Sequence, residues 1–222
     1  MTATQKKRVG RDLTSGPIMT SLLTFALPIV FTDVIQQLYS MVDLMVIGQF
    51  VGNIGTVGVN TGGEIADFLM PVATAFAAAG QIYIAQLAGA KREEEQKRAT
   101  GTFITLMLTA SLVFMVLTVA ASTPILHLLN CPAEALSEAK RYMVITAFGL
   151  PFIYGYNAVC GVLRGMGESE RPLIFILVAA TINIFLDILL VAVFDMGAAG
   201  TAIATALSQA GVSNPLMLLD EI

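Results

Sequence analysis

The chain is dominated by six long apolar runs, and this pattern limits the folds that it can adopt. Each run is long enough to cross a bilayer as a helix, which takes about 20 predominantly apolar residues. The runs are roughly twice as long as a barrel strand and show no alternation of apolar and polar residues, so they do not favour transmembrane β-strands. We therefore expect an all-α integral membrane protein with six transmembrane helices. The runs span residues 18–45, 56–88, 100–123, 141–162, 172–194 and 197–217.

Composition supports a membrane protein and argues against several other classes. Hydrophobic residues make up 56% of the 222-residue chain, and charged residues only 13%. A soluble domain carries about 25% charged residues. The composition therefore does not favour a soluble enzyme, a disordered segment or a nucleic-acid-binding protein. The chain also lacks zinc-protease, phosphate-binding and ATP-binding motifs, so neither enzymatic activity nor a cofactor is expected.

The basic residues predict the orientation in the membrane. Of the 12 Lys and Arg residues, ten lie in the first tail or in the joints after the second and fourth runs. Because cytoplasmic segments carry the excess of basic residues, both termini are expected in the cytoplasm. Residues 1–17 and 218–222 are then cytoplasmic tails, and residues 18–217 form a six-helix membrane lobe. The ten are Lys6, Lys7, Arg8, Arg11, Lys91, Arg92, Lys97, Arg98, Arg164 and Arg171, and the other two are Lys140 and Arg141.

The first run carries a polar stripe on one helical face. At 100° per residue, six polar side chains fall within about 120° of one another. A carboxylate in the hydrocarbon region costs about 2.5–3.5 kcal/mol on insertion scales, so such a stripe favours a water-filled cavity. The alternative is a seam of hydrogen bonds between helices. Pro28, about one turn before the stripe, should loosen the helix or simply kink it. The stripe consists of Thr32, Asp33, Gln36, Tyr39, Ser40 and Asp43.

A second polar pair lies in the fifth run. Asn183 and Asp187 are four residues apart, so they share one helical face. The first and fifth runs contain no Lys or Arg that could neutralise Asp43 or Asp187. We expect these side chains to hold a cation or to share a proton, with Asp43, Asn183 and Asp187 as the candidate ligands for Na⁺. No other metal site is expected. For Glu64 and Asp67, a solvated helix end is favoured over an accessory cation site.

Four segments together resemble one transporter family. They are LPIVFTDVIQQLYSMVDLMVIGQFVG in the first run, IAQLAGAKREEE after the second, LRGMGESERPL after the fourth, and INIFLDILLV followed by MGAAGTAIATALSQA. Their order and spacing resemble the amino-terminal half of multidrug and toxic compound extrusion (MATE) transporters, from about Leu13 to Gln209. The detail looks closest to the DinF-like and clostridial-type bacterial branches. The resemblance implies one lobe of a twelve-helix transporter in the bacterial plasma membrane.

The resemblance also implies a function and roles for individual residues. Such transporters expel cationic and amphipathic compounds in exchange for H⁺ or Na⁺. Asp43 matches the coupling residue of the first helix, and Pro28 matches the proline at which that helix bends. Asn183 and Asp187 match the fifth-helix pair, which Thr205 completes. Gln36, Tyr39 and Asn157 match residues that line the cavity.

The carboxyl-terminal end departs from the family pattern. Family members continue through a long loop into six more helices, whereas this chain reads SQAGVSNPLMLLDEI and stops. Asn214 and Pro215 should interrupt the sixth helix. We expect a half-length unit that works with a second six-helix lobe or a second copy of the chain. One alternative is a lipid-linked oligosaccharide flippase, which is disfavoured because the runs carry no basic residue except Arg141 at the very start of the fourth. The other is a membrane subunit or fragment without transport.

Overall fold

The computed structural model describes residues 17–212, and all its regular elements in that range are helices. The fold class predicted from the apolar runs is confirmed. Five stretches are long and apolar enough to cross a membrane, the fifth running through Glu170–Val193. The tails, residues 213–217 of the predicted last helix and the Asn214–Pro215 break lie outside the described residues, and the orientation of the ends remains a prediction. The helices are α1 Ile18–Phe50, α2 Gly52–Gly89, α3 Glu93–Leu128, α4 Leu136–Gly165, α5 Glu170–Asp187, the π-helix η1 Ile188–Val193, and α6 Ala198–Val212.

Most of the helices extend beyond the apolar runs. The predicted joint between the first two helices shrinks to Val51, since Gly52 turns the chain with a φ of 71°. The α3 helix starts at Glu93, seven residues before its run, because acidic residues in a first turn interact favourably with the helix dipole. The α4 helix continues through Gly165, so Arg164 belongs to its last turn rather than to a joint. Hydropathy marks the part of a helix within lipid, whereas the helix ends depend on local backbone geometry.

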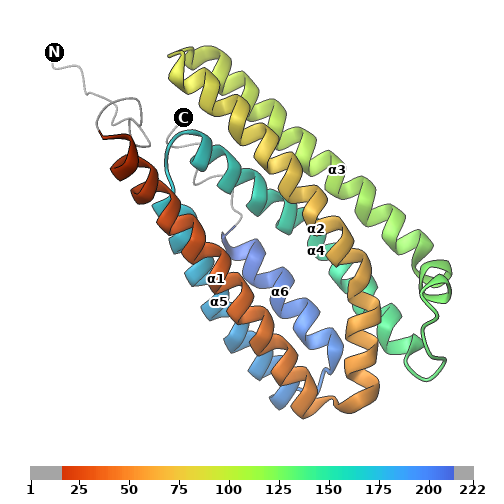
Figure 1. The fold of residues 1–222 in the computed structure, drawn as a ribbon. Helices are drawn as coiled ribbons and strands as arrows, with labels where there is room; N and C mark the ends of the chain where they lie inside the picture. Colours follow the sequence, from red (N-terminus) through yellow and green to blue (C-terminus); the bar gives the residue numbers. More distant parts are fainter. Residues whose placement is uncertain (1–16, 213–222) are drawn as a thin grey trace, which may run out of the picture.

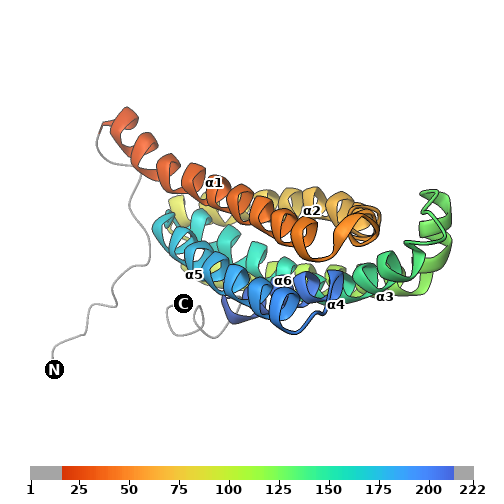
Figure 2. The same cartoon turned by 90° about the horizontal axis from the view of Figure 1, so that it is seen from below.

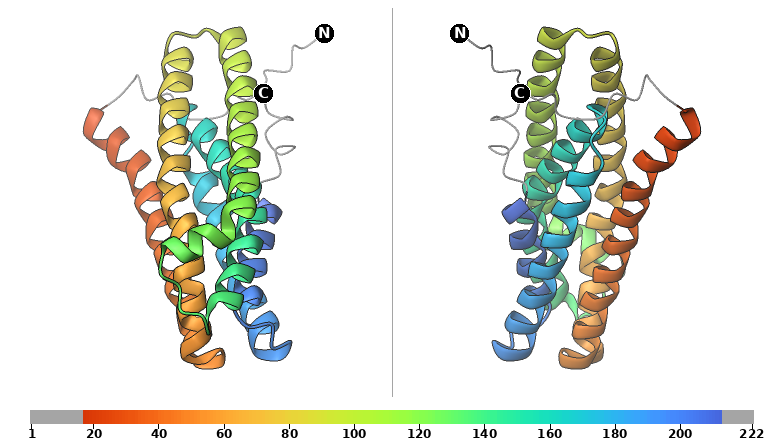
Figure 3. Two further views of the ribbon diagram at one scale, coloured as in Figure 1. Left: turned by 90° about the vertical axis from the view of Figure 1, so that its right-hand side faces the viewer. Right: turned by 90° about the vertical axis from the view of Figure 1, so that its left-hand side faces the viewer.

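The helices form two groups that α6 joins. In the first group, α4 packs along α2 and α3, and in the second, α1 packs along α5 (Figure 1). The α6 helix contacts both α4 and α5 and lies between the groups. Seen from below, α1 and α2 lie on one side of the lobe, and α3 to α6 lie on the other (Figure 2). The α1 helix leans away from α2 toward its amino-terminal end (Figure 3).

The α2 and α4 helices approach each other at backbone distance. A Cβ atom added to Gly62 would lie 2.5 Å from the Ala139 carbonyl oxygen, and one added to Gly165 would lie 2.8 Å from that of Gln81. Small residues allow this close packing in lipid, where van der Waals contact drives helix association. Between the two contacts, the buried Tyr154 hydroxyl donates a hydrogen bond to the Leu69 carbonyl at 3.1 Å. These two helices therefore form the tightly packed part of the lobe.

Candidate functional site

The carboxyl groups of Asp43 on α1 and Asp187 on α5 lie within hydrogen-bonding reach of each other. Asp187 is fully buried, and neither of its carboxyl oxygens has a hydrogen-bond donor among the described residues. Asp43 Oδ1 is buried and equally without a donor there. Because two carboxylates only accept hydrogen bonds, their proximity is unfavourable unless one carries a proton or a cation lies between them. The pair is thus suited to binding a proton or a cation.

Asn183 and Thr205 extend the acidic pair. Asn183 lies one turn before Asp187 on the same face of α5 and is 1% exposed. Its Nδ2 donates a hydrogen bond to Thr205 Oγ1 on α6 at 3.4 Å, while its Oδ1 has no donor among residues 17–212. The structure therefore brings Asp43, Asp187, Asn183 and Thr205 into one region between α1, α5 and α6. Their role in coupling stays a prediction.

The polar stripe of α1 divides into an inner and an outer edge. Thr32 is buried, and its hydroxyl donates to the Pro28 carbonyl at 2.8 Å. Tyr39 packs against the buried cluster on α4 and α5, and Gln36 is half-buried. Asp33 and Ser40 are exposed on the outer edge. The inner edge thus lies nearest the acidic pair.

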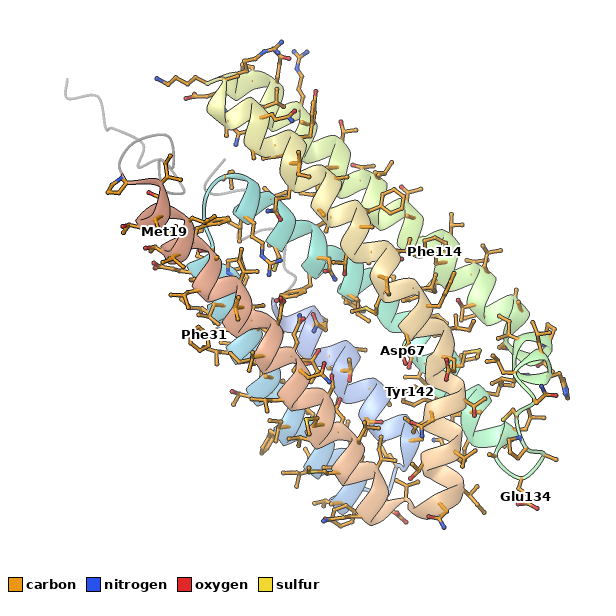
Figure 4. All side chains as sticks on the ribbon, in the orientation of Figure 1. Met19, Phe31, Asp67, Phe114, Glu134 and Tyr142 are labelled. Atoms are coloured by element: carbon orange, nitrogen blue, oxygen red, sulfur yellow. The ribbon has the colours of Figure 1, made fainter. Side chains whose placement is uncertain are left out.

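The opposite face of α1 is apolar and exposed. Its side chains are 47–56% exposed, as expected for a surface in contact with lipid or with another part of a larger assembly. Phe31 and Met19 illustrate this outward orientation in Figure 4. The face consists of Val30, Phe31, Val34, Leu38 and Met41.

Asn157 differs from the other predicted site residues. It is half-buried on α4, and its amide donates to the Ile153 carbonyl of the preceding turn at 2.9 Å. The hydrogen bond therefore stays within α4. The structure does not place Asn157 in hydrogen-bond contact with the acidic pair, and a cavity-lining role stays a prediction.

Two polar residues close to this site were not predicted from the sequence. Half-buried Tyr142 on α4 packs against the buried cluster of Ile47, Val59 and Ala198 and lies within electrostatic range of Asp43 and Asp187. Gln209 on α6 is buried, and its side-chain amide lies near the Tyr39 hydroxyl. A glutamine in the alanine-rich sixth run was a usable signal, because an amide in lipid needs partners. No comparable signal distinguishes Tyr142 from an interfacial tyrosine.

Tyr142 also lies within electrostatic range of Asp67 on α2. Figure 4 shows the two residues on neighbouring helices. Asp67 and Glu64 lie three residues apart, and neither is buried in the described part of the chain. Both lie within α2, 12 and 15 residues after Gly52, rather than at an end of the helix, and their contact with water stays a prediction.

Comparison with known proteins identifies the family. The sequence model of the MatE family matches residues 28–189, which include Asp43, Asn183 and Asp187. The chain belongs to the MatE family. This confirms the resemblance to multidrug and toxic compound extrusion transporters, and it supports a multi-pass membrane transporter over an enzyme.

Individual relatives of this MatE chain are bacterial. It is 29% identical over 198 residues to "Probable multidrug resistance protein YpnP" of Bacillus subtilis, covering 89% of this chain and 44% of that protein. It is 25% identical over 192 residues to "Multidrug export protein MepA" of Staphylococcus saprophyticus, covering 86% and 42%. The chain therefore spans less than half the length of these curated relatives.

The fold matches solved MATE structures. The MATE multidrug transporter DinF-BH superposes with a TM-score of 0.88 at 26% identity. The match covers 97% of this chain and 49% of that chain. The six helices thus correspond to about half of a full-length MATE transporter.

Proposed function

We propose that this chain is the cation-binding lobe of a multidrug efflux antiporter in the bacterial plasma membrane. It exports cationic or amphipathic compounds in exchange for H⁺ or Na⁺. The observation that carries this proposal is the group of buried acceptor oxygens on Asp43, Asp187 and Asn183, which lack donors among the described residues. The names of the bacterial relatives support multidrug efflux at the family level.

The geometry suggests how cation binding acts on the lobe. A proton or Na⁺ between Asp43 and Asp187 removes the repulsion between α1 and α5, and its release restores that repulsion. The α1 helix packs mainly on α5, and it contains Pro28, which cannot donate a backbone hydrogen bond. Release of the cation therefore acts on a helix that has weaker contacts with the rest of the lobe than α5 has. Gln36 and Tyr39 on the inner edge of that helix would line the substrate cavity.

The proposal includes a second lobe. The chain aligns with 44% of YpnP and 49% of DinF-BH, so its six helices match one half of each. The substrate cavity would form between this lobe and its partner. The partner is a second six-helix lobe in a longer protein or a second copy of the chain.

Dye efflux from transporter-deficient bacteria tests the function. Cells that produce the parent chain are compared with cells that produce Asp43→Asn or Asp187→Asn, and Asp33→Asn is the matched control on the exposed edge of α1. We expect efflux from the parent and the control but not from the two site variants. Separate variation of Na⁺ and external pH then identifies the coupling ion. Efflux that persists in both site variants would refute the coupling site, and absence of efflux from the parent would favour a non-transporting fragment.

Cation binding by the purified chain gives a second measurement. A ligand that binds the folded state stabilises it by RT ln(1 + [L]/Kd) and so raises the melting temperature. We expect Na⁺ or acidification to stabilise the parent but not the Asp43→Asn and Asp187→Asn double variant. Equal stabilisation of both proteins would place the binding elsewhere.

A further inference from the structure

A column of three polar side chains follows one face of α4 toward its carboxyl end. Tyr156, Cys160 and Arg164 are spaced four residues apart, so they lie one above the other. Tyr156 and Cys160 are each 3% exposed and lie beside each other. Arg164 is within electrostatic range of both. Because side chains on a helix point toward its amino-terminal end, the guanidinium extends toward the Cys160 turn.

Arg164 has no acidic partner in the described part of the chain. Its Nε atom is buried and has no hydrogen-bond acceptor there. The nearest acid along the chain, Glu168, lies 3.9 Å from Arg171 and accepts a hydrogen bond from the Glu170 backbone N–H at 3.1 Å. A cation that is partly removed from water without a counter-charge is unfavourable for stability. Arg164 is therefore not explained by a contribution of its charge to the stability of the fold.

The column connects to the acidic site through Tyr39. Tyr156 and Tyr39 belong to one packed cluster, and Tyr39 is within electrostatic range of Asp43. The Tyr156 hydroxyl is buried and has no hydrogen-bond partner among residues 17–212. Ile176 and Ala179 of α5 belong to the same buried cluster. The space between the acidic pair and the carboxyl end of α4 is thus tightly packed and ends at a fixed positive charge.

We propose that Arg164, together with Tyr156 and Cys160, forms a barrier to cations at this end of the acidic site. A fixed arginine charge in a narrow, poorly hydrated passage repels protons and metal cations. H⁺ or Na⁺ would then reach Asp43 and Asp187 only from the opposite end of the lobe. The basic residues predict that the barrier faces the cytoplasm, where it prevents uncoupled cation leak. This inference rests on the proposed cation-binding function.

Proton leak through proteoliposomes tests the barrier. The chain is reconstituted with a pH-sensitive dye inside, and a valinomycin-induced potassium potential drives proton entry. Removing one charge at short range in a medium of low permittivity should raise the leak of Arg164→Gln about tenfold. Arg164→Lys, which keeps the charge, and Arg171→Gln, a matched change at the same end, should leak like the parent. An Arg164→Gln variant that leaks like the parent would overturn the barrier.

A double variant shows whether the leak passes through the acidic site. Adding Asp43→Asn to Arg164→Gln should return the proton leak to the parent level. A leak that persists in the double variant contradicts the inference, because protons would then bypass the acidic pair. Neither result depends on drug efflux. Loss of efflux with an intact barrier would refute the proposed function alone, whereas an unchanged leak would refute only the barrier.

A thiol measurement keeps Arg164 in place and does not depend on the folding of its variants. In a Cys131→Ser chain, Cys160 is the only remaining thiol. Its reaction with an anionic methanethiosulfonate is compared with that of a cationic one, and each rate is divided by the rate with glutathione. We expect the normalised rate with the anionic reagent to be about ten times the rate with the cationic one. If Cys160 is fully shielded, neither reagent should react until the chain is denatured in dodecyl sulfate. Equal or faster normalised reaction with the cationic reagent would contradict a positive barrier.

Discussion

Adding a single methyl group at Gly62 should separate α2 from α4. Its Cβ atom would lie 2.5 Å from the Ala139 carbonyl oxygen and 3.2 Å from the Ala139 Cα and carbonyl carbon. All three are backbone atoms, so a change of side-chain rotamer does not relieve the clash. The two helices must move apart, and the tight packing around them is then lost.

The expected magnitude follows from two opposing terms. Overpacking a close contact costs about 1–3 kcal/mol. Alanine gains about 1 kcal/mol over glycine in a helix interior. Because the contact is with backbone, the upper part of the first range applies, and Gly62→Ala should lose about 1–2 kcal/mol net.

Gly101 on α3 is the matched control, since it is exposed and a Cβ atom there would meet nothing within 4 Å. Only the helix-propensity term applies, so Gly101→Ala should gain about 0.5–1 kcal/mol. With about 2–4 °C per kcal/mol for a chain of this size, Gly62→Ala should lower the melting temperature by several degrees and Gly101→Ala should raise it slightly. Thermal unfolding of the purified chain in detergent measures both. A higher melting temperature for Gly62→Ala would refute the backbone contact.

Four further predictions concern three single side chains. Burial raises the pKa of the Cys131 thiol, so less thiolate is present at neutral pH, and maleimide labelling should accelerate as the pH rises past about 9; labelling at pH 7 as fast as that of glutathione would contradict this. An impermeant maleimide should label Cys131 on intact cells if the predicted orientation is correct. Asp187→Leu should raise the melting temperature, because an unsatisfied buried polar group costs about 1–3 kcal/mol, while abolishing efflux. Glu168→Ala should lower the melting temperature, because it removes the acceptor for the Glu170 and Arg171 backbone N–H groups at a cost of about 1 kcal/mol. Glu168→Gln keeps an acceptor oxygen and should retain most of the stability.

The sequence allowed prediction of the six helices and the core of the site for the same physical reason. Long apolar runs identify helices in lipid, and polar residues within them are costly enough to be informative. The helical angle placed Tyr39 and Asp43 on one face, and the four-residue spacing placed Asn183 beside Asp187. The structure confirms these shared faces and adds that α1 and α5 bring the two acids together.

Other features depend on tertiary packing and were not predictable from one sequence. Tyr142 approaches the acidic pair only because α4 packs along α2 and α6, where this side chain meets the cluster of Ile47, Val59 and Ala198. Arg164 looked like a loop residue, since the apolar run ends before it, yet α4 continues through Gly165 and carries it beside Tyr156. Local periodicity says which residues share a face, but it does not say which helix that face meets.

The π-helix η1 is the remaining unpredicted element, and its position links the site to the packing of the lobe. It begins at Ile188, directly after Asp187, and π-helical turns are frequent at functional sites. A Cβ atom added to Gly200 of α6 would lie 3.2 Å from the Leu190 carbonyl carbon, so α6 packs directly against η1. The α6 helix in turn packs on α4, which is held tightly to α2. Asp187 is therefore connected through η1 and α6 to the tightly packed helices α2 and α4, while Asp43 lies on α1, which packs mainly on α5. A change in the charge of the pair should consequently displace α1 and leave Asp187 in place.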